Sequence, residues 1–401
     1  MTADSSPYSS EQSKADRKRG YRVKRDSGSY RRQLEGYRAF IPHPLPPDPP
    51  VAYDQELRRL LSDADLALGR LDGSVEALPN PELFVFMYVR KEAVLSSQIE
   101  GTQASLGDLL EAEARLFDPH RPDDTEEIVN YVAAMNHGLE RLRDLPLSLR
   151  LIREIHQRLM QGVRGQHATP GEFRRSQNWI GAAGSSLSTA SFVPPPPALL
   201  PDILGNLEKF LHRNDHLPTL IRLGLIHAQF ETIHPFLDGN GRVGRLLITF
   251  CLCEAKILGS PVLYLSHYFK RHRERYYDLL QATREDGEWE AWLKFFLTGI
   301  AEVANEAAAT AKKIVRLRED HRDVLINRLG RASANGLRLL ESMYQRPIFT
   351  VSNVRELLGV TYQAANDWTD RFMTLGLIAE ITGNKRNRVF RYDPYVRLFT
   401  D

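Results

Sequence analysis

Residues 234–245 read His-Pro-Phe-Leu-Asp-Gly-Asn-Gly-Arg-Val-Gly-Arg, and stretches with the apolar spacing of helices lie on both sides of them. Apolar residues recur every three or four positions over residues 220–233, and a strongly apolar run covers residues 246–252. The quoted segment is therefore predicted to be a tight loop that feeds the N-terminus of a buried helix. Helical spacing also continues from about residue 50 to residue 329, which predicts a mainly α fold.

The loop has the properties of an anion site. A helix N-terminus presents free backbone N–H groups and the positive end of the helix dipole. Gly239 and Gly241 let the backbone come close to a ligand. Arg242 and Arg245 add guanidinium groups that suit phosphate oxygens. Together these features predict a phosphate-binding loop.

Two further residues supply chemistry to this loop. Asp238 offers the hard oxygen that Mg²⁺ takes alongside substrate phosphates, and His234 can act as a general base near neutral pH. The letters Gly239-x-Gly241-x-x-Gly244 match a dinucleotide fingerprint, but that fingerprint needs a preceding strand, and the predicted approach here is helical. The sequence therefore favours phosphate chemistry over dinucleotide binding.

Residues 227–245, His-Ala-Gln-Phe-Glu-Thr-Ile-His-Pro-Phe-Leu-Asp-Gly-Asn-Gly-Arg-Val-Gly-Arg, resemble the signature of the Fic (filamentation induced by cyclic AMP) family. The resemblance covers roughly residues 45–300. It implies a helical Fic core with a small β-hairpin flap and a protein adenylyltransferase activity, in which AMP passes from ATP to a hydroxyl of a protein target. The segment at residues 178–197, rich in Gly, Ala and Ser and ending in four prolines, lies where the family has its flap, which pins a target segment by strand addition.

The same resemblance implies a role for individual residues. His234 would deprotonate the target hydroxyl, and Asp238 would hold the Mg²⁺ that bridges the phosphates. Tyr276 or Tyr277 would lie against the nucleotide, with ordinary core packing as the equal alternative. The implied nucleotide-binding residues are Glu100, Gln229, Gly239, Asn240, Gly241, Arg242, Arg245 and Tyr276.

Ser96-Ser-Gln-Ile-Glu100-Gly101 ends a helical run that begins near Pro81. Alone it is an ordinary helix end capped by glycine. Beside the Fic signature it resembles the family's inhibitory motif, with Glu100 expected to pair with Arg245. A carboxylate in that place would take the position of the γ-phosphate and leave the α-phosphate out of line. The resemblance also leaves open a reverse reaction, the removal of AMP.

Composition places the chain among globular proteins, with 42% hydrophobic and 26% charged residues and a formal net charge of +2. No global charge argues for nucleic acid or membrane. No apolar run is long enough to span a membrane, and Cys251 and Cys253 cannot bridge on one helix, so a reduced, cytoplasmic protein is expected. The expected organisation is a disordered basic arm (1–40), an N-terminal helical region with the inhibitory helix (41–125), a catalytic core (126–300), a linker helix (301–330) and a C-terminal module (331–401).

The C-terminal module has the order of a winged helix-turn-helix, with three helices and then a hairpin. Its expected wing is basic, with Lys385, Arg386 and Arg388, but its expected recognition helix carries Asp367 and Asp370. DNA binding is therefore open but disfavoured, and a role in dimerisation, target presentation or packing is preferred.

Three alternatives stay open from the sequence. One is a DNA-binding regulator whose Fic core senses nucleotide, and another is a transferase that uses a different donor such as UTP. The third is an enzyme that also removes AMP. The sequence names neither the target nor the acceptor, which can be Tyr, Thr or Ser, and self-modification and a homodimer are both compatible with it.

Overall fold

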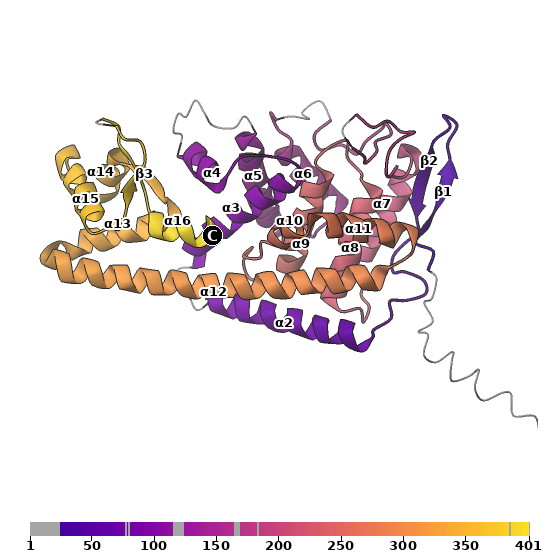
Figure 1. The fold of residues 1–401 in the computed structure, drawn as a ribbon, viewed down its shortest axis with the longest axis horizontal. Coiled ribbons are helices and arrows are strands. Elements are labelled where there is room, and N and C mark those ends of the chain that lie inside the picture. Colours follow the sequence, from indigo (N-terminus) through magenta and orange to yellow (C-terminus); the bar gives the residue numbers. More distant parts are fainter. Residues whose placement is uncertain are drawn as a thin grey trace, which may run out of the picture.

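The computed structural model describes residues 25–76, 78, 81–114, 124–163, 169–182, 184–384 and 386–400. Figure 1 shows a helical body and a C-terminal module at its far end, joined by the long helix α12. The body contains β1 (Gly28–Arg32), β2 (Arg38–Pro42), α2 (Gln55–Glu76), α3 (Pro81–Ile99), α4 (Leu106–Glu113), α5 (Thr125–Arg141), α6 (Leu149–Leu159), η1 (Pro197–Leu199), α7 (Leu200–Leu211), α8 (Thr219–Ile233), α9 (Asn240–Glu254), α10 (Ser266–Arg271) and α11 (Arg273–Glu285). The rest comprises α12 (Trp289–Leu329), η2 (Gly330–Ala332), α13 (Ser333–Gln345), β3 (Ile348–Thr350), α14 (Val351–Leu358), α15 (Tyr362–Thr374), β4 (Ala379–Glu380), β5 (Val389–Arg391) and α16 (Asp393–Thr400).

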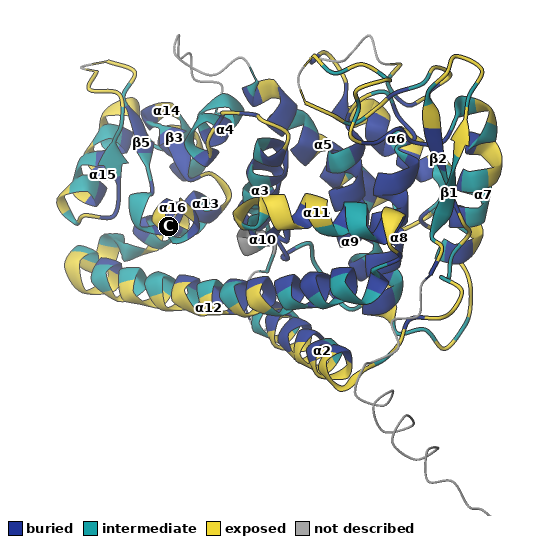
Figure 2. Ribbon diagram, turned by 45° about the vertical axis from the view of Figure 1, so that its right-hand side comes forward, coloured by how far each residue is buried: buried dark blue, intermediate teal, exposed yellow. Residues whose placement is uncertain are grey.

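Helices α8 and α9 form the centre of the body and are buried on nearly every side (Figure 2). Trp292 of α12 packs against α8 and donates its indole N–H to the carbonyl of Gly224, at 2.8 Å. A Cβ at Gly224 would lie 2.7 Å from Leu293, so only glycine allows this close approach. The mainly α prediction is confirmed, and the central helix pair holds the predicted loop between its two members.

Helix α12 is continuous from Trp289 to Leu329, so the expected boundary between a core ending at 300 and a linker helix beginning at 301 falls inside one helix. No proline interrupts this stretch, and its helical pattern does not break. Small buried side chains, Ala304, Ala307, Ala308 and Ala311, recur along it, and α2 packs against part of its length (Figure 1).

Part of the expected disordered arm is ordered. Strands β1 and β2 pair in antiparallel register, with Tyr30 opposite Phe40. Arg25 is buried, donates to the carbonyls of Pro49 and Pro50, and forms a two-pronged ion pair with Glu290 at the start of α12. This partner is 265 residues away in the sequence, which is why a local reading of composition missed it. Residues 1–24 of the expected arm lie outside the described residues.

The C-terminal module contains the expected helices α13, α14 and α15, and a three-stranded sheet of order β3-β5-β4. Strand β3 and helix α16 are additions that the sequence analysis did not anticipate. Phe399 of α16 packs edge-on against Tyr88 of α3, with ring centroids 5.2 Å apart, so this module contacts the helix that carries Ser96. None of the helices in the described ranges is long and apolar enough to cross a membrane.

Candidate active site

His234 follows directly after α8 in a left-handed backbone conformation, with φ 49° and ψ 60°. Its backbone N–H makes the last helical hydrogen bond, to the carbonyl of Phe230 at 2.9 Å, and its left-handed conformation then turns the chain into the loop. Burial and, second, the guanidinium of Arg284 lower the pKa of His234 to about 4. The imidazole is therefore neutral at pH 7, which is the form that accepts a proton.

The loop is held from below by side chains that point away from solvent. The side chain of Asn240 accepts from the N–H of Phe236 and donates to its carbonyl, both at 2.8 Å. His156 of α6 stacks on Phe236, with ring centroids 3.7 Å apart. Its Nδ1 accepts from the N–H of Gly171 at 2.9 Å, so its Nε2 donates to the carbonyl of Asp238 at 3.0 Å. The buried Asn240 side chain leaves only the backbone of that residue to face a ligand.

The loop borders a cavity of about 790 Å³ under the flap, the segment of residues 178–197. His234, Asp238, Gly239, Asn240, Gly241, Arg245, Glu100 and Tyr276 all line it, as the sequence predicted for one site. Tyr277, Arg284, Glu231 and the flap residues Trp179, Ile180, Gly181, Ser191 and Phe192 also line it. Gly239 has φ 77°, and the first turn of α9 begins directly after it. The helix N-terminus therefore opens into the cavity, where it favours an anion.

Glu100 reaches this helix N-terminus from the end of α3. Its Oε1 lies 2.6 Å from Nη2 of Arg245. Arg245 also donates from Nε to the hydroxyl of Ser96 at 2.8 Å and from Nη2 to the Ser96 carbonyl at 3.0 Å. Burial raises the pKa of Glu100, but the Arg245 guanidinium opposes it and holds that pKa below its usual value. The carboxylate is charged at neutral pH and fills the cationic end of the cavity.

Two predicted nucleotide-binding residues are not brought to the cavity. Arg242 is buried and pairs with Glu127 of α5 at 3.1 Å, with its Nη2 3.7 Å from Asp238. Gln229 donates to the carbonyl of His43 at 2.9 Å, beside the proline-rich segment. Helix geometry explains why Gln229 points away from the cavity. Glu231, two residues later and roughly 200° around the helix, faces the cavity instead.

Asp238 fits a Mg²⁺ ion that arrives with a nucleotide. Its side chain is half exposed, lines the cavity, and accepts from the N–H of Gly239 at 2.6 Å. Among the described residues no group of three or more His, Cys, Asp and Glu side chains could hold a metal by itself. One carboxylate beside a phosphate site is the usual protein share of such a Mg²⁺ site, because phosphates and waters supply the other ligands.

Four residues of the site were missed by the sequence analysis. Arg284 is buried, hydrogen-bonds to the hydroxyl of Thr232 at 3.2 Å, and lies over the ring of Phe192 at 4.1 Å. It is two helical turns after Tyr276 on α11, and that spacing was the available signal. Glu231 lay inside the quoted signature, and burial raises its pKa to about 7. Arg174 and Asn178 hold the loop carbonyls, which no local pattern reveals.

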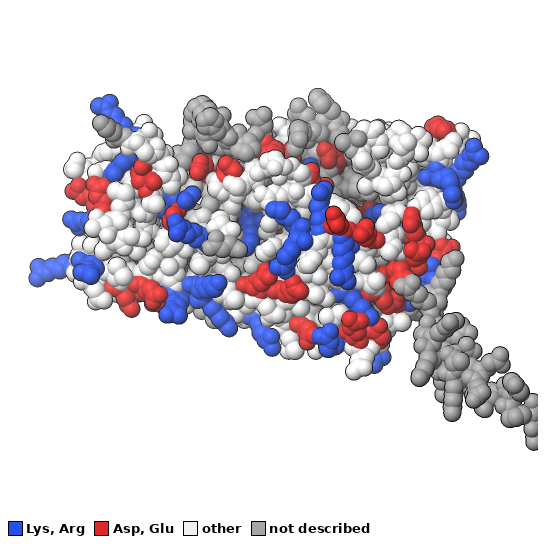
Figure 3. All heavy atoms as spheres, in the orientation of Figure 1, with Lys and Arg blue, Asp and Glu red and all other residues white. Residues whose placement is uncertain are grey.

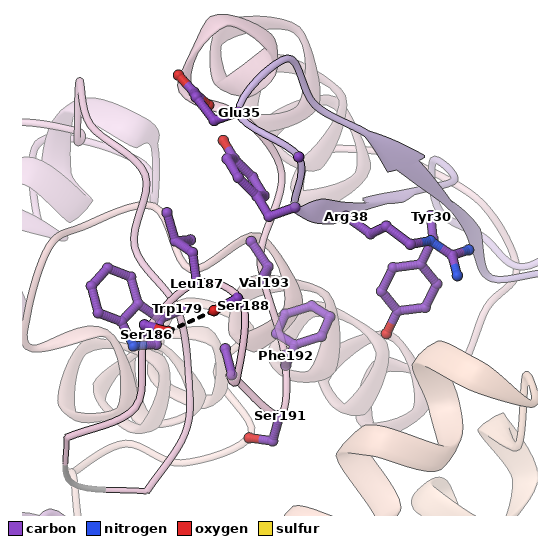
Figure 4. Close-up of a pocket in the computed structure, with 13 residues that line it drawn as sticks. Tyr30, Glu35, Arg38, Trp179, Ser186, Leu187, Ser188, Ser191, Phe192 and Val193 are labelled. Atoms are coloured by element: carbon purple, nitrogen blue, oxygen red, sulfur yellow. Dashed lines mark hydrogen bonds between the residues drawn. The ribbon is translucent and has the colours of Figure 1, made fainter.

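A second cavity of about 830 Å³ adjoins the first and shares Trp179, Ser191 and Phe192 with it. Figure 4 shows its two walls, the flap and the β1–β2 hairpin with Tyr30 and Arg38. In the described part of the flap, an antiparallel β-bridge joins Ile180 and Phe192 where the small β-hairpin was expected. The two cavities together form a surface that leads along the flap to His234.

The sequence of this chain is similar to those of known proteins. Residues 58–140 match the family described as "Fic/DOC family N-terminal", and residues 146–252 match "Fic/DOC family". The protein adenylyltransferase Fic of Aedes aegypti is 33% identical over 181 residues, which cover 43% of this chain and 32% of that protein. A probable protein adenylyltransferase of Aquifex aeolicus is 27% identical over 210 residues, covering 51% of this chain and 58% of that protein. The chain thus spans between about a third and somewhat over half the length of these two relatives.

Solved structures share the fold. A Fic family protein from Desulfovibrio desulfuricans G20 aligns over 86% of this chain and 97% of its own, with a TM-score of 0.56 and 19% identity. A Fic domain containing signaling protein from Bacteroides thetaiotaomicron aligns over 65% of this chain and 97% of its own, with a TM-score of 0.50 and 19% identity. With both family matches lying on the helices and the loop that build the cavity, the chain belongs to the Fic/DOC family.

Proposed function

We propose that this chain is a protein adenylyltransferase that moves AMP from ATP onto a hydroxyl of a protein and is inhibited by its own Glu100. One observation carries the proposal. A neutral imidazole, His234, and a helix N-terminus line the same cavity, and a carboxylate of the chain already fills the cationic end of that cavity. This arrangement suits an anionic substrate whose reacting phosphorus lies near a base.

The proposed reaction is a displacement at the α-phosphorus of ATP, with His234 as the base. The neutral His234 takes the proton of the acceptor hydroxyl, and the oxygen forms a bond to the α-phosphorus of ATP. The bond from that phosphorus to the bridging oxygen breaks, and pyrophosphate leaves with the electron pair. The backbone N–H groups of Asn240 and Gly241, in the first turn of α9, are the donors that would stabilise the charge on the phosphates. The N–H of Gly239, the third residue expected in this role, already donates to the carboxylate of Asp238. Arg245 would bind the terminal phosphate once Glu100 leaves it.

Asp238 would hold a Mg²⁺ ion with the phosphates, and such an ion neutralises the charge that develops on the leaving group. The side chain is available for this role because, among the described residues, its only short hydrogen bond comes from the N–H of Gly239 and engages one of its two oxygens, Oδ1. Arg242 has a different role in the proposal from the one expected. Because it pairs with Glu127 and lies within 4 Å of Asp238, it would support the loop rather than grip the phosphates.

Inhibition follows from the ion pair between Glu100 and Arg245. With Arg245 occupied, ATP would place its terminal phosphate elsewhere, and its α-phosphate would lie out of line with the acceptor. A displacement of about 1 Å at a reacting centre lowers the rate on the order of a hundredfold. The protein target would lie along the flap, and the second cavity between the flap and the β1–β2 hairpin would extend that surface.

The C-terminal module stays outside the proposed activity. Its Arg388 is neutralised by Asp370 of α15 at 2.7 Å and also bonds to Asn366. Lys385 of the expected wing lies outside the described residues. Figure 3 shows acidic and basic side chains interspersed on one face of the molecule, and on that face the described residues form no large basic surface of the kind that binds nucleic acid.

The test compares ATP labelled at the α-phosphate with ATP labelled at the γ-phosphate. We expect a Glu100→Gly variant with Mg²⁺ to retain α-label on protein, to release labelled pyrophosphate from γ-labelled ATP, and to lose both activities when His234→Ala is added. His212→Ala, which changes an exposed histidine outside the cavity, is the matched control. Retention of γ-label would indicate a kinase. No retained label from ATP, but retention from UTP, would keep the enzyme and change the donor.

A further inference from the structure

The carbonyl oxygen of His234 accepts two side-chain hydrogen bonds. Arg174 donates to it from Nε at 2.9 Å, and Asn178 donates from Nδ2 at 3.2 Å. The carbonyl belongs to the left-handed residue that ends α8, and it lies next to the imidazole that serves as base in the proposed function. Non-glycine residues adopt this conformation only when their surroundings hold them in it. Arg174 and Asn178 are those surroundings.

Both donors also hold neighbouring parts of the loop. The Asn178 amide reaches the carbonyl of Phe236 at 2.8 Å, and the backbone N–H of Arg174 donates to Pro235 at 2.9 Å. Arg174 is buried, with 2% of its surface exposed. In the described part of the chain its guanidinium makes no ion pair and is satisfied by carbonyl oxygens. A buried cation held this way is committed to positioning backbone.

The same two residues fix the flap. Asn178 is the first residue of the flap, and Arg174 donates from Nη2 to the carbonyl of Pro195 near its other end, at 2.6 Å. Gln177 closes the base of the flap by donating to Pro194 at 3.0 Å. Asn178 thus begins the flap, Arg174 is hydrogen-bonded near its other end, and both side chains are hydrogen-bonded to the loop that follows α8.

We propose that Arg174 and Asn178 are positioning residues that hold His234 and the flap in one rigid frame, so that an acceptor lying along the flap meets the imidazole. This inference rests on the proposed function for its catalytic meaning, while the frame itself is a property of the fold. Neither side chain lines the nucleotide cavity. The frame therefore sets the position of the acceptor hydroxyl relative to the imidazole of His234, and it leaves the affinity for the nucleotide unchanged.

The test uses the full chain with Glu100→Gly as background. Asn178→Asp keeps the shape of the side chain and removes its two N–H donors, and Asn130→Asp is its control, because Asn130 donates to the carbonyl of Gln161 away from the cavity. Arg174→Lys and Arg174→Met form a graded pair. Arg222→Lys is their control, because Arg222 also donates to a carbonyl, that of Phe210, but outside the cavity.

We expect Asn178→Asp to lower turnover by about tenfold to a hundredfold and to leave the Kd for ATP within about twofold. We expect Arg174→Lys to retain part of the turnover that Arg174→Met loses. The amides of Ile180 and Phe192, which donate to each other's carbonyls, should exchange with deuterium faster in each variant and not in the controls.

Unchanged exchange at Ile180 and Phe192 in every variant would overturn the frame, whatever the activity does. Faster exchange with normal turnover would overturn its catalytic meaning, as would a loss of turnover that merely follows a loss of folded protein. If Glu100→Gly transfers no nucleotide at all, the proposed function fails, and the exchange measurement still decides whether the frame exists.

Discussion

The carboxylate of Glu100 and the guanidinium of Arg245 meet at 2.6 Å, although 145 residues separate them in the sequence. The pair lies at the N-terminus of α9, where an anion is favoured by the helix dipole as well as by the arginine. We expect Glu100→Gly to raise the rate of AMP transfer by about ten- to a hundredfold, since it frees Arg245 for a phosphate. Initial rates with labelled ATP measure this effect.

Two variants define the cause of that increase. Glu100→Gln keeps the shape of the side chain and loses its charge, so it should give an intermediate rate. Glu113→Gln removes a carboxylate that pairs with Arg90 at 2.6 Å on a neighbouring helix and should leave the rate unchanged. Equal rates for wild type and Glu100→Gly would show that the ion pair does not inhibit the enzyme.

The pH dependence of transfer should report the unusual environment of His234. Burial and then Arg284 lower its pKa to about 4, so the neutral, basic form persists to lower pH than for an ordinary imidazole. In the Glu100→Gly background, kcat/KM should stay high as the pH falls from 7 to 5 and decline only below that. Arg284→Gln should move the decline toward higher pH. An acid limb near pH 6.5 in the Glu100→Gly enzyme would contradict this account.

Much of this site could be predicted from the sequence because its chemistry is local. A glycine-rich loop between two helices is recognisable from spacing and composition alone, and His234, Asp238 and Gly241 all lie within one such segment. The pairing of Glu100 with Arg245 needed the family resemblance, because nothing local connects the two residues. The structure contains that ion pair.

What the sequence did not reveal depends on distant partners. Arg242 and Arg245 are chemically equivalent in the motif, but they lie three residues apart on α9, and Arg242 meets Glu127 of α5 while Arg245 meets Glu100. The ordered β1–β2 hairpin likewise depends on Arg25 finding Glu290. The composition of a segment describes only the residues of that segment. It contains no information about a partner that is distant in the sequence and becomes a neighbour only in the folded chain.

Asp238→Asn should abolish the increase in turnover that Mg²⁺ gives, without changing the fold of the loop. The amide oxygen can still accept from the N–H of Gly239, but it no longer offers a charged ligand. In the Glu100→Gly background we expect turnover to fall by about a hundredfold or more, as when charge stabilisation at a transferring phosphate is lost. A titration with Mg²⁺ measures it, and chelation of the metal should reduce the parent enzyme to the same level. An unchanged Mg²⁺ response in Asp238→Asn would place the metal elsewhere.

Gly241→Ala tests where the anion lies. A Cβ at Gly241 would stand 2.2 Å from Oε1 of Glu100 and 3.0 Å from Nη1 of Arg245, so the methyl group would fill the place of the bound carboxylate. In the Glu100→Gly background it would meet the phosphate instead, and we expect the Kd for ATP to rise by about tenfold or more, equivalent to roughly 1.4 kcal/mol. Gly205→Ala is the matched control, because no described residue lies within 4 Å of a Cβ there, and alanine in a helix interior stabilises by about 0.5–1 kcal/mol relative to glycine. Equilibrium binding of ATP to both variants gives the comparison, and an unchanged Kd for Gly241→Ala would mean that the phosphates do not occupy the site now held by Glu100.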